Sequence, residues 1–323
     1  MAKKISLTGF VPEALAGQRI DQVLAKLFPD YSRARLSLWL KNGHVTVNGK
    51  IWRPKDKTLG NESITIEALL EEETWEAESI PLDIIYEDDS LIVINKPAGL
   101  VVHPAHGNFE HTLVNALLFH CPELSQLPRA GLIHRLDKDT TGLLVVAKTL
   151  PIHHALVKAM QQREIARTYQ AIVFGKPPTK GSIKTGMSRH PHQRLKMAVS
   201  NSIFSKPAIT HYTRLGHYPP LSHLEIQLET GRTHQIRVHM NHIKHPIIGD
   251  PLYGIPGKQA AKYSSISPDI SQFLETFSRQ ALHAYRLSLT HPKTQEIMKW
   301  KAPLPADMQT LLDLMKAEQD TTL

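Results

Sequence analysis

An acidic side chain stands among cations in residues 131–142, which read Gly-Leu-Ile-His-Arg-Leu-Asp-Lys-Asp-Thr-Thr-Gly. Asp137 follows Arg135 and precedes Lys138, and the apolar run 143–147 after it is typical of a buried strand. A neighbouring guanidinium favours the ionised carboxylate and lowers its pKa by about 1 to 3 units. Such a carboxylate can act as a nucleophile. Taken alone, however, the pattern is more typical of an acid that caps a turn and pairs with Arg135 or Lys138.

Four further strings lie along the chain, one before residues 131–142 and three after them. They are Asn-Lys-Pro-Ala-Gly-Leu-Val-Val-His-Pro at 95–104, Arg-Thr-Tyr at 167–169, Glu-Thr-Gly-Arg-Thr-His-Gln-Ile-Arg-Val-His at 229–239 and His-Pro-Ile-Ile-Gly-Asp-Pro-Leu-Tyr-Gly at 245–254. Together with the His-Arg-Leu-Asp string, they resemble the pseudouridine synthases of the RluA family. The resemblance is strongest to the branch that modifies the large ribosomal subunit, and it covers nearly the whole chain.

The resemblance implies a reaction and three catalytic residues. Uridine becomes pseudouridine when the N1–C1′ bond breaks, the base turns, and C1′ joins C5. Asp137 would be the catalytic carboxylate, Arg237 the cation paired with it in the cleft, and Tyr169 the ring that stacks on the base and has been proposed to remove the C5 proton. Two routes stay open for Asp137, namely a covalent adduct or proton removal at C2′ to give a glycal. Spacing alone predicts a packed Tyr169 and a solvent-facing Arg237 on a strand.

The resemblance also implies contacts with the substrate. A stacked or paired uridine must leave the helix before it can react, and Arg135 would fill the space that it leaves. His134 and Ile236 are further substrate-binding candidates. No redox step or energy input is needed, and the chain has no Gly-x-x-x-x-Gly-Lys-Ser/Thr phosphate loop, so no cofactor is expected.

Composition agrees with an RNA partner. The chain has 323 residues, 38 basic and 30 acidic, which gives a net charge of +8. An excess of Lys and Arg suits a polyanion. The single Cys121 excludes an intramolecular disulfide. No signal peptide and no apolar run of about 20 residues is present, so we expect a soluble, cytoplasmic protein that does not bind membranes. A monomer is the default expectation.

Residues 1–70 predict a small separate domain. Residues 20–27 have the apolar spacing of one helix face, and Ser32 is a plausible N-cap for a second helix that carries Arg33, Arg35 and Lys41. Strands are expected at 45–50 and 63–66. This order resembles the S4 RNA-binding domain, so Arg33 and Arg35 are predicted to contact RNA; the alternative is a solvated helix face.

Residues 71–80 predict an acidic linker, and 81–323 the catalytic domain. Strands are expected at 91–95, 143–148, 169–174, 224–228, 236–240 and 286–290, and helices at 113–119, 152–162 and 270–276. This irregular alternation predicts an α+β fold with a mixed, largely antiparallel sheet. The resemblance implies the pseudouridine synthase fold, in which the sheet is bent and the cleft crosses its middle. Residues from about 317 are expected to fray.

Two other groups of residues could bind ligands. The basic segment from Arg189 to Lys196 is a candidate RNA-clasping loop. On one helix, adjacent pairs among His239, His242 and His245 would lie on roughly the same face, but Pro246 follows, a strand is expected before them, and no acid or cysteine completes a zinc set. No metal is therefore predicted.

Three functions remain in competition. The first is isomerisation of uridine in large-subunit (23S) ribosomal RNA, with the helix 69 loop as the implied target, or at another rRNA or tRNA site. The second is a non-catalytic ribosome-assembly factor that binds RNA through the S4-like domain. The third is a glycosidase-like hydrolase, which needs two carboxylates about 5 to 9.5 Å apart.

Overall fold

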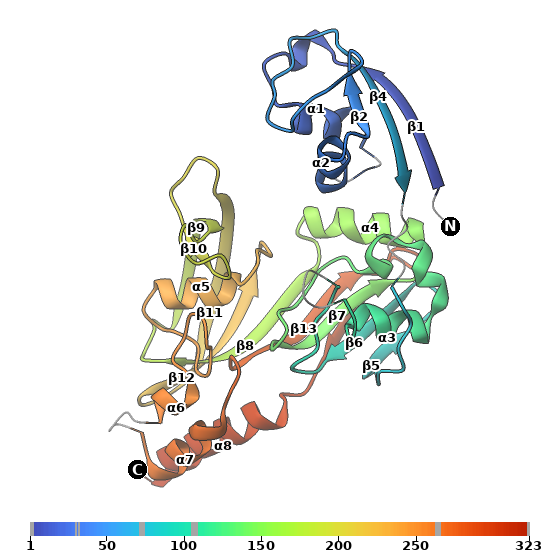
Figure 1. The fold of residues 1–323 in the computed structure, drawn as a ribbon. Helices are drawn as coiled ribbons and strands as arrows, with labels where there is room; N and C mark the ends of the chain where they lie inside the picture. The colour runs from blue at the N-terminus through green and yellow to red at the C-terminus, as the bar shows by residue number, and fades with distance from the viewer. Residues whose placement is uncertain are drawn as a thin grey trace. The chain divides into compact units, whose positions relative to one another are not determined.

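The computed structural model describes residues 3–29, 31, 33–70, 75–104, 109–261 and 266–321. The chain forms two compact units, Met1–Thr74 and Trp75–Leu323, and each has its own sheet and core (Figure 1). Among the described residues, no helix is long and apolar enough to cross a membrane.

The first unit is a four-stranded antiparallel sheet with two helices. The strands lie in the order β1-β4-β2-β3. The elements are β1 (Lys3–Phe10), η1 (Glu13–Leu15), α1 (Ile20–Leu27), α2 (Arg33–Lys41), β2 (Val45–Val47), β3 (Lys50–Ile51) and β4 (Ser63–Leu70). Both predicted helices and the predicted strands are confirmed, while β1 was not predicted. The proposed cap Ser32 lies outside the described residues.

Hydrophobic burial holds this unit together. The apolar face of α1 packs with one face of α2 and with alternate residues of the strands. Such helix and strand periodicities place apolar groups on one side of each element, which is what a small two-layer domain requires. The buried members include Ile20, Val23, Leu24, Leu36, Leu40, Val45, Val47, Ile64 and Ile66.

The second unit is built on one ten-stranded sheet. Its order is β10-β9-β11-β12-β8-β13-β7-β6-β5, with β14 paired to β13. The pair β13–β7 is parallel and the other pairs are antiparallel, so the predicted α+β class with a mixed sheet is confirmed. The strands are β5 (Ile84–Glu87), β6 (Leu91–Lys96), β7 (Thr141–Ala147), β8 (Ala166–Phe174), β9 (Lys180–Arg189), β10 (Met197–Val199), β11 (Lys206–Tyr218), β12 (Leu221–Leu228), β13 (Leu282–Thr290) and β14 (Ile297–Lys301).

Both faces of this sheet are covered at its β6–β7 end. Ile94 and Leu144 lie in a core with α3 (Leu113–His120), whereas Val93 and Val145 lie in a second core with α4 (Leu150–Gln161). Successive side chains of a strand point to opposite faces. Two covered faces therefore explain why β6 and β7 are continuous apolar runs rather than alternating ones.

The remaining helices lie toward the other end of the sheet. The helix α5 (Gln235–His242) packs against β10 and β11, and α7 (Pro268–Thr276) packs against α8 (Ala306–Thr321), as Figure 1 shows. Short helical turns complete the unit: η2 (Pro122–Gln126), η3 (Pro128–Gly131) and α6 (Gly257–Ala260).

One predicted element is wrong. Residues 236–240 are not a strand but part of α5, and the chain from about 317, expected to fray, continues α8 to Thr321. The error in α5 has a clear cause, because Ile236, Val238 and Met240 alternate with polar residues as in a half-buried strand. Yet Arg237 is 4% exposed and His239 0%, so the alternation does not mark a solvent-facing side.

The segment 75–80 lies along the second unit. The Glu78 amide donates to the Asn115 carbonyl at 3.0 Å, and Asn115 Nδ2 donates to the Glu76 carbonyl at 2.7 Å. The Trp75 ring meets the His103 ring edge-on, with centroids 4.8 Å apart. This half of the acidic segment is therefore anchored to α3, while residues 71–74 lie outside the described part of the chain.

Candidate active site

Asp137 lies in the loop that enters β7, and this loop is fixed from both sides. The Asp137 backbone carbonyl accepts a hydrogen bond from the Thr140 amide at 3.1 Å. The Lys138 carbonyl accepts one from Lys96 Nζ at 2.7 Å, and the Asp139 carbonyl accepts one from Arg279 Nη1 at 3.3 Å. The backbone around Asp137 is thus held by two cations, and its own carboxylate remains available, with the side chain 17% exposed.

The Arg237 side chain bridges two carboxylates. Its Nη1 donates to Asp137 Oδ2 at 3.0 Å, across 100 residues of sequence. Its Nε and Nη2 donate to the two oxygens of Asp250 at 2.7 and 2.8 Å. The expected pairing of Asp137 with Arg237 is therefore confirmed as geometry, and Asp250 is a third member of the cluster that the sequence did not single out.

Asp250 is the buried anchor of this cluster. It is 0% exposed, and its Oδ1 also accepts from the amides of Leu252 and Tyr253 at 2.9 and 3.1 Å. The ion pair and hydrogen bonds of a buried carboxylate offset the free-energy cost of removing its charge from water. In the sequence, Asp250 could have been recognised as an acid inside a largely apolar string, directly before Pro251.

Arg237 is held in its charged form. Burial acts to lower its pKa, but the hydrogen bonds and charge of Asp250, and then those of Asp137, raise the pKa above its ordinary value. A permanently charged guanidinium beside Asp137 donates to one oxygen of its carboxylate and fixes the direction of that side chain. A carboxylate held in this way can present its other oxygen to a substrate.

His234 and Tyr253 line the same cluster, and neither was predicted. His234 Nε2 lies 3.9 Å from Asp137 Oδ1, and its Nδ1 is 2.7 Å from the Tyr253 hydroxyl. Burial lowers the pKa of His234, and the charge of Asp137 opposes this. The Tyr253 ring centroid lies 5.1 Å from the Arg237 guanidinium carbon, close enough for a cation–π contact.

Tyr169 lies on β8 between β12 and β13, opposite Ile226 and Ala284. It is 5% exposed and belongs to the large core of the unit. Burial raises the pKa of its hydroxyl; Arg167 opposes this rise and Asp137 adds to it. The tyrosine therefore lies within electrostatic range of Asp137 and is neutral near pH 7.

Lys96 is fully buried. Its Nζ donates to the carbonyls of Pro97, Leu100 and Lys138 at 2.6, 2.9 and 2.7 Å. Burial lowers its pKa to about 7, against the charges of Asp139 and Asp137. Lys96 thus joins the turn after β6 to the loop that carries Asp137.

The other predicted binding residues have different surroundings. Arg135 is exposed, next to the cluster in sequence, whereas Ile236 is 4% exposed and packs in the core. The Nε2 atom of His134 accepts from the Val145 amide at 3.3 Å. Burial, followed by the charge of Arg167, lowers the pKa of His134 to about 3, so the neutral ring is tied to β7.

Arg33 and Arg35 lie on α2, in the first unit. Arg33 donates to the buried Asp21 through Nη2 at 2.6 Å, and Arg19 donates to the same carboxylate through Nε at 3.1 Å. About half of the Arg33 side chain remains exposed. The cations are thus partly ordered by Asp21 on a surface that stays open.

The N-terminus of α5 is fixed by polar side chains. Gln235 Nε2 donates to the Ile209 carbonyl and to Thr210 Oγ1 at 3.0 and 2.9 Å. The two ring nitrogens of His239 lie 2.9 Å from the hydroxyls of Thr210 and Thr185. These hydrogen bonds explain why the polar residues of α5 are buried. They also fix the position of the helix that carries Arg237.

No group of three histidine, cysteine or acidic residues that could hold a metal occurs among the described residues. The histidines at 239 and 242 do lie on one helix, contrary to the strand expected there, but His239 is engaged by threonines.

Comparison with known proteins identifies both units. Residues 90–242 match the model of the RNA pseudouridylate synthase family, and residues 18–64 match the S4 domain. The chain is 52% identical over 318 residues to ribosomal large subunit pseudouridine synthase D of Neisseria meningitidis serogroup A. The alignment covers 98% of this chain and 83% of the relative. It is 49% identical over 320 residues to the protein of the same name from Escherichia coli K12, covering 98% and 97%.

A solved structure agrees with the fold. Human RNA Pseudouridylate Synthase Domain Containing 4 superposes with a TM-score of 0.56 at 25% identity, over 72% of this chain and 92% of that one. The resemblance to the RluA family, the pseudouridine synthase fold and the S4-like domain are all confirmed.

Proposed function

The chain belongs to the RNA pseudouridylate synthase family and is an RNA isomerase, and on that premise we propose that it converts uridines of large-subunit ribosomal RNA into pseudouridine, with Asp137 as the catalytic carboxylate. The substrate follows from the names of its relatives, which are synthases of the ribosomal large subunit. The helix 69 loop is the proposed target, and the S4 domain, through Arg33 and Arg35, is the proposed second contact with RNA.

The observation that carries this proposal is the Asp137–Arg237–Asp250 cluster. Arg237 occupies one oxygen of Asp137 at 3.0 Å and leaves the other, Oδ1, with His234 at 3.9 Å as its nearest ion-pair partner. The carboxylate is therefore oriented by Arg237, while its second oxygen is not saturated by hydrogen bonds. A carboxylate in this state can attack C1′ or take a proton from C2′.

Two other residues have roles in the proposal. Tyr169 is buried, and the charge of Asp137 adds to the raised pKa of its hydroxyl, which supports a role in stacking on the uracil. A neutral hydroxyl is not a base, so Tyr169 would have to give up its own proton before it could remove the C5 proton. Arg135 is exposed at the loop and is free to enter the RNA helix when the uridine flips out, at a cost of about a few kcal/mol to the RNA.

The glycosidase alternative is disfavoured by Asp250. A hydrolase needs its second carboxylate to carry a proton to the leaving group or to activate water. Both oxygens of Asp250 are hydrogen-bonded to Arg237, one also accepts two backbone amides, and the residue is 0% exposed. This acid orients Arg237 and cannot reach a substrate.

The experiment is conversion of uridine in RNA by the purified protein. Ribosomal RNA from a strain that lacks the gene is incubated with the wild type, Asp137→Asn or Asp139→Asn, and pseudouridines are mapped by carbodiimide labelling and primer extension. The proposal expects new pseudouridines in helix 69 with the wild type and with Asp139→Asn, and none with Asp137→Asn. Release of free uracil would instead indicate hydrolysis, and full activity of Asp137→Asn would overturn the catalytic assignment.

A further inference from the structure

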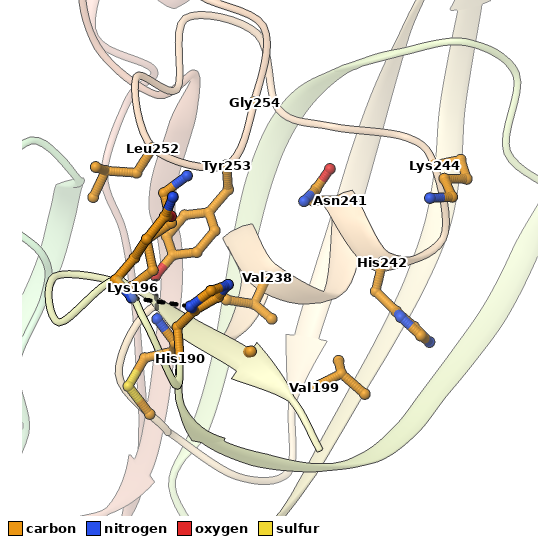
Figure 2. A pocket seen from close by; sticks show the side chains of 13 residues that line it. His190, Lys196, Val199, Val238, Asn241, His242, Lys244, Leu252, Tyr253 and Gly254 are labelled. Carbon is orange, nitrogen blue, oxygen red and sulfur yellow. Dashed lines mark hydrogen bonds between the residues drawn. The ribbon is translucent and has the colours of Figure 1, made fainter. Parts of the chain in front are cut away.

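A pocket of about 540 Å³ lies beside the candidate active site, between the β9–β10 hairpin and α5 (Figure 2). Its described lining contains two lysines, two histidines and two side-chain amides but no carboxylate, and the rest is mostly apolar. The lining residues are His190, Gln193, Lys196, Met197, Ala198, Val199, Val238, Asn241, His242, Lys244, Leu252, Tyr253 and Gly254. Pockets that hold small organic ligands span about 300 to 1,000 Å³, so one nucleotide fits this volume.

Tyr253 is the wall between the pocket and the catalytic cluster. Its hydroxyl contacts His234 at 2.7 Å, and its ring lies 5.1 Å from the Arg237 guanidinium carbon. Lys196 Nζ, on the pocket lining, lies 5.9 Å from the centre of the same ring. A group in the pocket is thus one aromatic ring away from the residues that hold Asp137.

Hydrogen bonds and apolar packing hold the walls of the pocket in place. The Met197 amide donates to the Tyr253 hydroxyl at 2.7 Å, which ties β10 to this wall. His190 Nδ1 accepts from the Gln193 amide at 3.1 Å and so fixes the hairpin turn. Val238 and Tyr253 belong to a small buried cluster that Met197, Val199 and Leu252 extend.

The two sides of the pocket offer different chemistry. Figure 2 shows His190, Lys196 and Tyr253 on one side and Asn241, His242 and Lys244 on the other. Ammonium groups hold phosphates without reading sequence, amides can hydrogen-bond the edge of a base, and Tyr253, which is 8% exposed, adds an aromatic wall. The phosphate and the base of a nucleotide therefore each find a matching group.

We propose that this pocket binds a second nucleotide of the substrate RNA, a neighbour of the target uridine in the chain. Lys196 and Lys244 hold its phosphates, Tyr253 supports its base or ribose, and Asn241 contacts the base edge. This inference rests on the proposed function for the identity of the RNA, and it adds a specificity site that is separate from Asp137.

The test compares four variants by RNA binding and by kinetics. The probe is a fluorescein-labelled stem-loop with the large-subunit helix 69 sequence, titrated at several salt concentrations. The variants are Lys196→Gln, Lys244→Gln, Asn241→Ala and the control Lys299→Gln, which removes an exposed lysine of β14 outside the pocket.

Each pocket variant is expected to raise Kd and KM by roughly three- to tenfold and to leave kcat within about twofold, because it loses positioning contacts only. Each lysine variant should also lower the salt slope of log K by about one, whereas Asn241→Ala should not. A misfolded protein would lose kcat as well.

Two results would overturn the inference. One is that all pocket variants match Lys299→Gln in Kd, KM and salt slope. The other is that only the lysine variants differ, because a diffuse basic surface would then suffice without a nucleotide site. Failure of the proposed function has another signature, since the wild type would then form no pseudouridine in ribosomal RNA while the binding comparison could still be made.

Discussion

Asp250 accepts two parallel hydrogen bonds from Arg237, from Nε to Oδ2 at 2.7 Å and from Nη2 to Oδ1 at 2.8 Å, and it is 0% exposed. Bidentate pairs of this kind fix the plane of the guanidinium as well as its position. The direction of the remaining Arg237 bond, to Asp137, is therefore set by an acid that the substrate does not reach.

Replacing Asp250 with Asn should damage both stability and activity. The buried guanidinium would lose its main counter-charge, which costs about 3 to 5 kcal/mol when one partner of a buried pair is removed. Urea unfolding measures this loss. Glu225→Gln, at the half-exposed pair with Arg286, should cost less than about 1 kcal/mol. Equal losses in the two variants would contradict the anchoring role.

The Asp137→Asn variant should lose activity by about 10³-fold or more, because an amide cannot act as nucleophile or base. It should still fold and bind RNA, since the neighbouring backbone is held by Lys96 and Arg279. Single-turnover conversion of the RNA stem-loop measures the loss. Asp139→Asn in the same loop is the matched control and should stay within about tenfold of the wild type.

Lys96→Met should destabilise the protein by about 3 kcal/mol or more. Methionine keeps most of the apolar stem but leaves the carbonyls of Pro97, Leu100 and Lys138 without their donor, and each unsatisfied buried group costs about 1 to 3 kcal/mol. Chemical denaturation is the measurement. Lys148→Met removes the partly exposed pair with Glu87 and should cost about 1 kcal/mol or less. A Lys96→Met protein as stable as that control would refute the bridging role.

His134 should contribute to loss of stability in acid. Its pKa is lowered to about 3 in the folded protein, first by burial and then by Arg167, from 6.5. The unfolded chain therefore binds the extra proton between these values, so stability is complete above about pH 6.5 and falls as the pH drops toward 3.

The measurement is the free energy of unfolding from pH 7 to pH 4 in the wild type and in His134→Gln. Glutamine can still accept from the Val145 amide but does not titrate, so the slope should be shallower by up to about 1.4 kcal/mol per pH unit. The exposed His192→Gln is the control. Parallel curves for the wild type and His134→Gln would show that His134 is not linked to folding.

The elements that the sequence predicted best are those whose apolar pattern results from burial in a hydrophobic core alone. The runs at β6 and β7 were recognised because both faces are covered by hydrophobic cores. The strands β9 and β11 were missed, since their residues are largely polar and only partly buried. α5 was misread as a strand because its buried polar side chains are compensated by partners far away in the sequence.

The site divides in the same way. Asp137 and Arg237 were paired through the family resemblance, and their atoms do meet across 100 residues. Asp250, His234 and Tyr253 were not singled out, because nothing local distinguishes a carboxylate that orients an arginine from one that caps a turn. Their roles depend on which side chains the fold brings together.

The three formal charges of Asp137, Arg237 and Asp250 leave the cluster with one surplus negative charge, in a chain whose total is +8. Coulomb repulsion at such short range disfavours an approaching phosphate diester. On the proposed function, the uncharged sugar and uracil ring are therefore expected next to this cluster, and the phosphates of the RNA against lysine and arginine side chains.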